Sequence, residues 1–95
     1  MSYIKYRIPL SKNLYLIKWL PKAISGIHNH SDKYCDVIVL NKSLYEYQYT
    51  LDKYKYNQVS KQNLDARVMY TLTPEIYHDV HNNNNSYVYS LNYYY

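Results

Sequence analysis

Phenylalanine is absent from this sequence, and cysteine, glycine and long apolar runs are scarce. The one cysteine, Cys35, excludes an internal disulfide framework. The one glycine, Gly26, excludes the glycine-rich loops that cradle phosphates in nucleotide-binding folds. The longest aliphatic run, Val37-Ile38-Val39-Leu40, is far shorter than the roughly 20 residues of a membrane span. No signal-peptide pattern opens the chain, so we expect one soluble, intracellular domain over residues 1–95, without a membrane partner.

Tyrosine dominates the residues that are present. The chain has 95 residues, and 42 of them are Tyr, Asn, Lys or Ile, with 16 Tyr alone. A hydrophobic content of 47% is too high for a disordered tail. A chain of this length buries roughly 60–65% of its unfolded surface, so the core is small. A homodimer with an aromatic interface and a monomer with half-buried tyrosines are equal alternatives.

Positive charge is concentrated in the first third of the chain. Residues 1–33 carry six Lys and Arg against one Asp, residues 34–65 are neutral, and residues 66–95 have a net charge of −1. Lysine and arginine beside aromatic rings suit single-stranded nucleic acid. The candidate nucleic-acid-binding residues are Tyr3, Lys5, Arg7, Lys12, Lys18 and Lys22. The competing interpretation, which the charges alone favour, is a solvated surface without a binding role.

Hydrophobic periodicity predicts the elements of the first half. Residues 3–8 alternate as a half-buried strand that Pro9 ends. Ser11 can cap a helix over residues 11–20 that Pro21 stops, although the same stretch also alternates as a strand. Residues 21–33 are expected to form a connection, and the apolar residues 34–40 a central strand.

The clearest pattern lies between residues 44 and 59. Tyrosines alternate with polar residues, and a two-residue turn at Asp52-Lys53 would pair Leu51 with Tyr54 and place five tyrosines on one face. We predict a hairpin whose tyrosine face forms the core; the alternatives are a helix, or an exposed stacking platform for bases. The exposed side of the first strand, with Tyr3, Lys5 and Arg7, is the better candidate for a contact surface.

In the last third, residues 60–65 are expected to form a loop and residues 66–72 a strand. Thr73-Pro74-Glu75 has the pattern of a helix start, and that helix would end near His81, before the turn-forming asparagines 82–85. Residues 86–95 alternate as a final strand. The predicted fold class is therefore α+β: a single small domain with an antiparallel or mixed sheet of about five strands and two short helices.

Histidines form two close pairs, His28-x-His30 and His78-x-x-His81. With Cys35 or Asp32 they offer ligand types that Zn²⁺ accepts. Neither pair belongs to a recognised metal-ligand pattern, so we interpret all four as surface histidines that flank loops and predict no metal site. Cys35 is expected to be a buried, inert thiol. Because no nucleophile, phosphate or cofactor motif is present, we predict no enzyme activity, no catalytic residue and no cofactor.

The richness in Tyr, Asn, Lys and Ile resembles the small accessory proteins of filamentous viruses that infect archaea. That resemblance covers the composition of the whole chain and transfers no functional residue. It implies an accessory protein that acts on host protein or nucleic acid inside the infected cell. The predicted function is that of a non-enzymatic protein in the host cytoplasm, which binds a host or viral protein through its tyrosine-rich surface. The alternative is a small basic nucleic-acid-binding module that uses the N-terminal Lys and Arg residues.

Overall fold

The secondary structure of the described chain consists of β-strands. The computed structural model describes residues 3–95, and none of them forms a helix long and apolar enough to cross a membrane. The strands are β1 (Tyr3–Arg7), β2 (Leu14–Trp19), β3 (Cys35–Val39), β4 (Ser43–Asp52), β5 (Lys55–Asp65), β6 (Met69–Leu72), β7 (Tyr77–His81) and β8 (Val88–Tyr94). The predicted α+β class is therefore wrong, and the fold is all-β.

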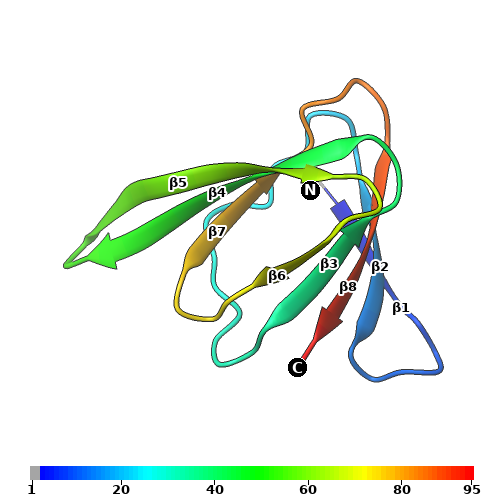
Figure 1. The fold of residues 1–95 in the computed structure, drawn as a ribbon, viewed down its shortest axis with the longest axis horizontal. Coiled ribbons are helices and arrows are strands. Elements are labelled where there is room, and N and C mark those ends of the chain that lie inside the picture. Colours follow the sequence, from blue (N-terminus) through cyan, green and yellow to red (C-terminus); the bar gives the residue numbers. More distant parts are fainter. Residues whose placement is uncertain (1–2) are drawn as a thin grey trace.

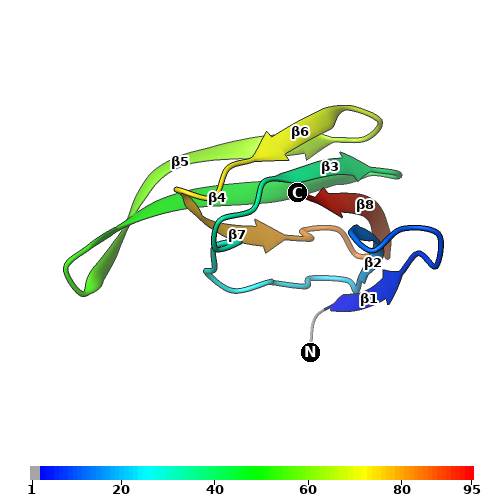
Figure 2. The same cartoon turned by 90° about the horizontal axis from the view of Figure 1, so that it is seen from below.

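The strands form two antiparallel sheets. The larger sheet has five strands in the order β1-β2-β8-β3-β6, and the smaller has three in the order β5-β4-β7. Figure 2 shows the larger sheet from β1 at the bottom to β6 at the top. The end of the β4–β5 hairpin projects beyond the other strands (Figure 1).

Both predicted helices are strands. Residues 14–19 form β2, which pairs with β1 on one side and β8 on the other. The second expected helix, after Thr73-Pro74-Glu75, is replaced by β7, which pairs with β4. In each case neighbouring strands satisfy the backbone hydrogen bonds. The local capping signals are weaker than this tertiary pairing, which also suits the β-propensity of Tyr, Ile and Trp.

The predicted hairpin exists, but its turn and its buried face differ from the prediction. The turn is formed by Lys53 and Tyr54, so Leu51 pairs with Tyr56. Strand β5 continues to Asp65 through the segment predicted as a loop. The tyrosines do not form the core, because β4 buries Leu44 and Glu46 and leaves the alternating tyrosines half-buried. Hydrogen bonds from glutamine side chains to Glu46 make a polar residue acceptable on the inner face.

The core consists mainly of small and medium-sized side chains. None of the 16 tyrosines is buried; each is half-buried or exposed. Trp19 supplies the largest apolar side chain of the interior and is 4% exposed. The buried apolar residues are Ile17, Trp19, Ala23, Cys35, Val37, Val39, Leu44, Leu64, Leu72, Val80 and Val88.

A line of buried polar groups follows the inner face of β8. Trp19 Nε1 donates to Ser90 Oγ at 3.0 Å, and Ser90 Oγ donates to Asn92 Oδ1 at 2.8 Å. Asn92 Nδ2 in turn donates to the sulfur of Cys35 at 3.5 Å. Because each polar atom has a partner, the strand can bury these residues, and the line ends beside a cavity.

Candidate functional site

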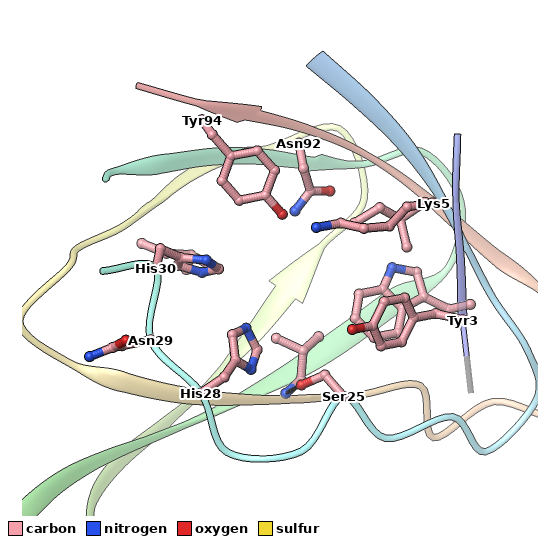
Figure 3. Close-up of a pocket in the computed structure, with 12 residues that line it drawn as sticks. Tyr3, Lys5, Ser25, His28, Asn29, His30, Asn92 and Tyr94 are labelled. Atoms are coloured by element: carbon pink, nitrogen blue, oxygen red, sulfur yellow. Dashed lines mark hydrogen bonds between the residues drawn. The ribbon is translucent and has the colours of Figure 1, made fainter. Parts of the chain in front are cut away.

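A cavity of about 250 Å³ opens on the inner face of the larger sheet. Tyr3 and Lys5 reach it from β1, and Asn92 and Tyr94 reach it from β8 (Figure 3). The connection before β3 closes another side with His28 and His30, whose rings lie beside the same space. The cavity thus combines imidazoles, one ammonium group and hydroxyl groups on a partly apolar floor that includes Trp19, Leu72 and Val80.

Backbone contacts fix the position of His28. Its N–H and carbonyl form two hydrogen bonds with the backbone of His78 on β7, at 2.9 and 2.6 Å. Gly26 turns the chain two residues earlier with a φ of +84°, which glycine adopts without strain. The carbonyl of Gly26 lies 2.8 Å from His28 Nδ1. Because a carbonyl only accepts, Nδ1 carries the proton and the lone pair of His28 is on Nε2.

His30 has a buried nitrogen without a partner. Its Nε2 is sealed from solvent, and no described group hydrogen-bonds to it. Burial, and then the nearby charges of His28, His78 and Lys5, lower the pKa of His30 to about 4. The imidazole is therefore neutral near pH 7, which is the form that binds metal ions. An unpaired buried nitrogen of this kind indicates a site for a ligand or ion.

His78 packs against His30 on the side of the protein interior and is fully buried. Its ring stacks on His30 with the centroids 5.5 Å apart, and its centroid is 6.5 Å from that of His28. Both of its nitrogens face acceptors: Nδ1 forms an ion pair with Glu46, and Nε2 lies 3.1 Å from the carbonyl of Thr73. These contacts complement an imidazolium ring and leave no free lone pair.

Glu46 is the buried acid of the site. Burial alone would raise its pKa, but hydrogen bonds from His78, Gln62 and Gln48 outweigh that effect and lower it. Gln62 Nε2 and Gln48 Nε2 donate to one carboxylate oxygen at 2.6 and 3.0 Å, and the other oxygen contacts His78. The carboxylate is therefore ionised and fully engaged.

Cys35 and Tyr94 are cross-strand partners on β3 and β8. Cys35 is fully buried, as predicted. Burial raises the pKa of its thiol to about 11. Burial, and then the neighbouring thiol, also raise the pKa of Tyr94. Both groups are protonated near pH 7, so the tyrosine at the cavity wall can donate a hydrogen bond.

The structure brings Lys5 together with Tyr3 at one cavity and with Lys12 at a second, but it places the other candidate nucleic-acid-binding residues elsewhere. Tyr3 packs on Trp19 with the ring centroids 5.0 Å apart, and Tyr3 and Lys5 line the cavity. Lys12 lines a second cavity, and Arg7 ends β1 opposite Tyr15. Lys18 lies over the ring of Tyr87 at 4.3 Å, and Lys22 Nζ donates to the carbonyl of Asn83 at 2.9 Å.

The interpretation of all four histidines as surface residues is wrong. His78 is buried, and His28 and His30 converge with it beside the cavity. His81 lies apart and contacts Asp79 at 2.9 Å. The spacing of His28 and His30 was the available signal. Glu46 was missed because it alternates with the hairpin tyrosines that we assigned to the core. Asn92 and Tyr94 were missed because the alternation of residues 86–95 does not tell which side of the strand faces inward.

Solved structures with a similar arrangement of strands include cupin domains. The cupin domain of Drosophila melanogaster CENP-C matches with a TM-score of 0.75 and 10% identity, over 98% of this chain and 68% of that chain. A cupin domain of an XRE family transcriptional regulator from Enterobacter cloacae matches with a TM-score of 0.71 and 12% identity, over 100% and 97%. A predicted oxalate decarboxylase from Thermotoga maritima matches with a TM-score of 0.62 and 15% identity, over 85% and 63%. These similarities show the cupin fold.

The sequence itself shows to which family the chain belongs. The profile of the cysteine dioxygenase type I family matches residues 4–95, and the chain belongs to this family. A comparison with curated protein sequences gives no match. The compositional assignment to viral accessory proteins is therefore wrong, and so is the expectation of a non-enzymatic protein, because the family is named for an enzyme. Amino-acid composition reports codon bias and solvation, whereas the family match depends on the order of residues.

Dioxygenase chemistry implies a redox-active metal ion, and two residues of the cavity fit one. Imidazole nitrogens suit iron, copper, nickel and zinc. His28 and His30 offer two such nitrogens, one of them buried and without a partner. Within residues 3–95, no group of three His, Cys, Asp or Glu side chains is placed to hold a metal ion together, and both nitrogens of His78 already face Glu46 and the carbonyl of Thr73. The protein thus presents a two-histidine site with a third histidine behind it.

Proposed function

We propose that this chain is a metal-dependent oxygenase that acts on a small thiol of amino-acid size. The observation that carries the proposal is the buried, unpartnered Nε2 of His30 beside the oriented imidazole of His28, in a cavity of about 250 Å³. That volume lies below the usual range for drug-sized ligands and suits a molecule such as cysteine. The family name, cysteine dioxygenase type I, supports the same substrate class.

His28 and His30 would hold the metal ion, which supplies the binding and activation of dioxygen. The proposed reaction forms two S–O bonds: the thiol becomes a sulfinic acid, losing four electrons, and both atoms of O₂ are reduced and transferred to sulfur. No other oxidant or reductant is needed for this balance.

The cavity also offers a place for the charged end of such a substrate. The ammonium of Lys5 lies over the Tyr94 ring, 4.8 Å from its centroid, and extends into the cavity (Figure 3). We propose that it pairs with the substrate carboxylate, while the Tyr94 hydroxyl and the Asn92 amide orient the remaining polar groups. The hydrogen bonds of Asn92 with Ser90 and Cys35 hold that amide in place.

Metal binding and oxygen uptake test this proposal separately. Anaerobic loading with Fe(II) is expected to raise the melting temperature of the protein. When cysteine and O₂ are then added, the loaded protein is expected to consume O₂ and to form the sulfinate of cysteine, which mass spectrometry identifies. His30→Ala and His28→Ala should each weaken metal binding by roughly 100-fold, a loss like that from removing a metal-supporting group. The matched control is His81→Ala, which lies outside the cavity. If neither metal-dependent stabilisation nor oxygen uptake occurs, the proposal is wrong.

We also propose a protein contact, at the projecting end of the β4–β5 hairpin. Leu51, Tyr54, Tyr56 and Val59 are all exposed there, Tyr54 completely. Strand β5 is an edge strand, with unpaired backbone groups along its outer side. An edge of this kind fits the same strand of a second copy, as in an antiparallel homodimer. Light scattering on wild type and on Val59→Lys, which places a charge on that edge, tests it; a wild-type monomer would exclude the dimer.

A further inference from the structure

A second cavity, of about 270 Å³, lies beside the first and is lined by six residues from separate segments. Three of them are lysines: Lys5 on β1, Lys12 in the β1–β2 connection and Lys33 in the connection before β3. Asn13, Tyr15 and Tyr94 complete the lining, which contains no Asp or Glu. This hollow therefore collects half of the six basic residues of the first third of the chain.

Backbone hydrogen bonds hold the segments that carry these lysines. The N–H of Tyr94 donates to the carbonyl of Asn13 at 3.0 Å, which ties the β1–β2 connection to β8. The N–H of Lys33 donates to the carbonyl of His30 at 3.0 Å, closing a turn next to the first cavity. The ammonium of Lys5 lies over the rings of Tyr15 and Tyr94, at 5.2 and 4.8 Å from their centroids. The backbone at all three lysines is thus held in place, and the Lys5 ammonium is also positioned by the two rings.

Three lysines line this hollow, and its lining holds no acidic side chain that would compensate them. An anion with two or more charges would supply that compensation and accept hydrogen bonds from the lysines, from the Asn13 amide and from the tyrosine hydroxyls. A single carboxylate would satisfy only part of this set.

We propose that this second cavity binds a small polyanion, whose phosphate or carboxylate groups lie among Lys5, Lys12 and Lys33. The cavity volume favours a compact molecule over a nucleic-acid strand, which needs an extended groove.

Because Lys5 and Tyr94 line both cavities, the two sites are coupled. An anion in the second cavity attracts the Lys5 ammonium away from a carboxylate in the first, so it would compete with substrate. This consequence rests on the proposed function, whereas polyanion binding does not.

Calorimetry on the intact chain at low ionic strength tests the site, with pyrophosphate, citrate and a single-stranded oligonucleotide as probes. The variant is Lys12→Gln with Lys33→Gln, whose two side chains are exposed. The matched control is Lys55→Gln with Lys61→Gln, which removes the same charge from exposed positions on β5. Pyrophosphate or citrate should bind wild type and control alike, and the variant should bind about tenfold or more weakly. Whichever of pyrophosphate and citrate binds more tightly shows whether the site prefers phosphate or carboxylate groups.

Three results would overturn the proposal. The first is an equal loss in variant and control, which would show an effect of net charge alone. The second is no binding of either small anion to wild type. The third is oligonucleotide binding that is stronger than that of both small anions and lost in the variant, which would assign the lysines to nucleic acid. All of these readouts are independent of oxygen uptake, so a failure of the enzymatic proposal leaves them interpretable.

Discussion

His78 and Glu46 form an ion pair inside the protein, with their side chains 1% and 0% exposed. They lie on diagonal positions of β7 and β4, since Gln48 is the direct partner of His78 and Val80 that of Glu46. The pair joins the smaller sheet to the histidines of the cavity, because His78 also pairs through its backbone with His28.

Breaking this pair should destabilise the protein strongly. Glu46→Gln keeps the shape of the side chain but leaves the imidazolium without its carboxylate. The expected loss is about 3–5 kcal/mol in the free energy of unfolding, because one charge remains buried and unpaired. Urea denaturation measures this loss. The control, Glu75→Gln, removes an exposed acid and should change stability by less than about 0.5 kcal/mol. A similarly small effect for Glu46→Gln would show that the buried pair is not ionised.

The stability of the metal-free protein should fall as the pH decreases from about 6.5 to about 4. His30 has a pKa of about 4 in the folded state, where burial is the main cause, and an ordinary value of 6.5 when unfolded. Between these values the unfolded chain binds more protons, so acid favours unfolding, with a slope of up to about 1.4 kcal/mol per pH unit. Above pH 6.5 His30 is neutral in both the folded and the unfolded chain, so it no longer makes the stability depend on pH.

Urea denaturation at a series of pH values measures that slope, and His30→Gln should remove it from this window. The lowered pKa of Glu46 acts in more acidic solution, below the ordinary value of 4.5, so the two effects separate. A slope that persists unchanged in His30→Gln would contradict the assignment.

Cys35 should resist alkylation in the native protein. Its thiol is fully buried, and burial raises its pKa to about 11, so almost no thiolate is present near pH 8. Iodoacetamide labelling followed by mass spectrometry is expected to be slow in buffer and rapid in urea. Rapid labelling of the folded chain would show that the packing around Cys35 and its hydrogen bond from Asn92 open readily.

Lys53→Gly should stabilise the β4–β5 hairpin. Lys53 has a φ of +56°, whereas Tyr54, the second turn residue, is not in the positive-φ region. This is the pattern of a type II′ turn, which favours glycine at its first central position. Relief of the left-handed conformation should add up to about 1 kcal/mol in urea denaturation. Tyr54→Gly is the control and should be neutral or destabilising, since its backbone gains nothing from glycine.

The strands whose pattern was local could be predicted from the sequence. Strands β1 and β8 and the β4–β5 hairpin follow from alternation, and β3 follows from its apolar run. The two expected helices failed because Ser11 and Thr73-Pro74-Glu75 carry capping signals that hold only when no strand is adjacent. Pairing with β8 and with β4 is a long-range property that a local pattern does not contain.

The site was predictable only in its parts. The spacing of His28 and His30 marked candidate ligands, but nothing local indicates that His78 would lie beneath them. The inner face of β4 was misassigned because we took the largest aromatic face for the core. Glu46 is accepted inside because Gln48, Gln62 and His78 satisfy its oxygens, and one of these is 32 positions away in sequence.

Strand β8 lies in the middle of the larger sheet, although it follows every other strand in the chain. Its partner β2 is reached across most of the sequence, with Leu14 opposite Tyr93. During synthesis the β1–β2 hairpin and the β3–β6 pair must therefore wait, each with one open edge, until residues 88–94 leave the ribosome. Folding is expected to be slow, because these pairings are long-range, and the exposed edges make the nascent chain a substrate for chaperones until β8 is in place.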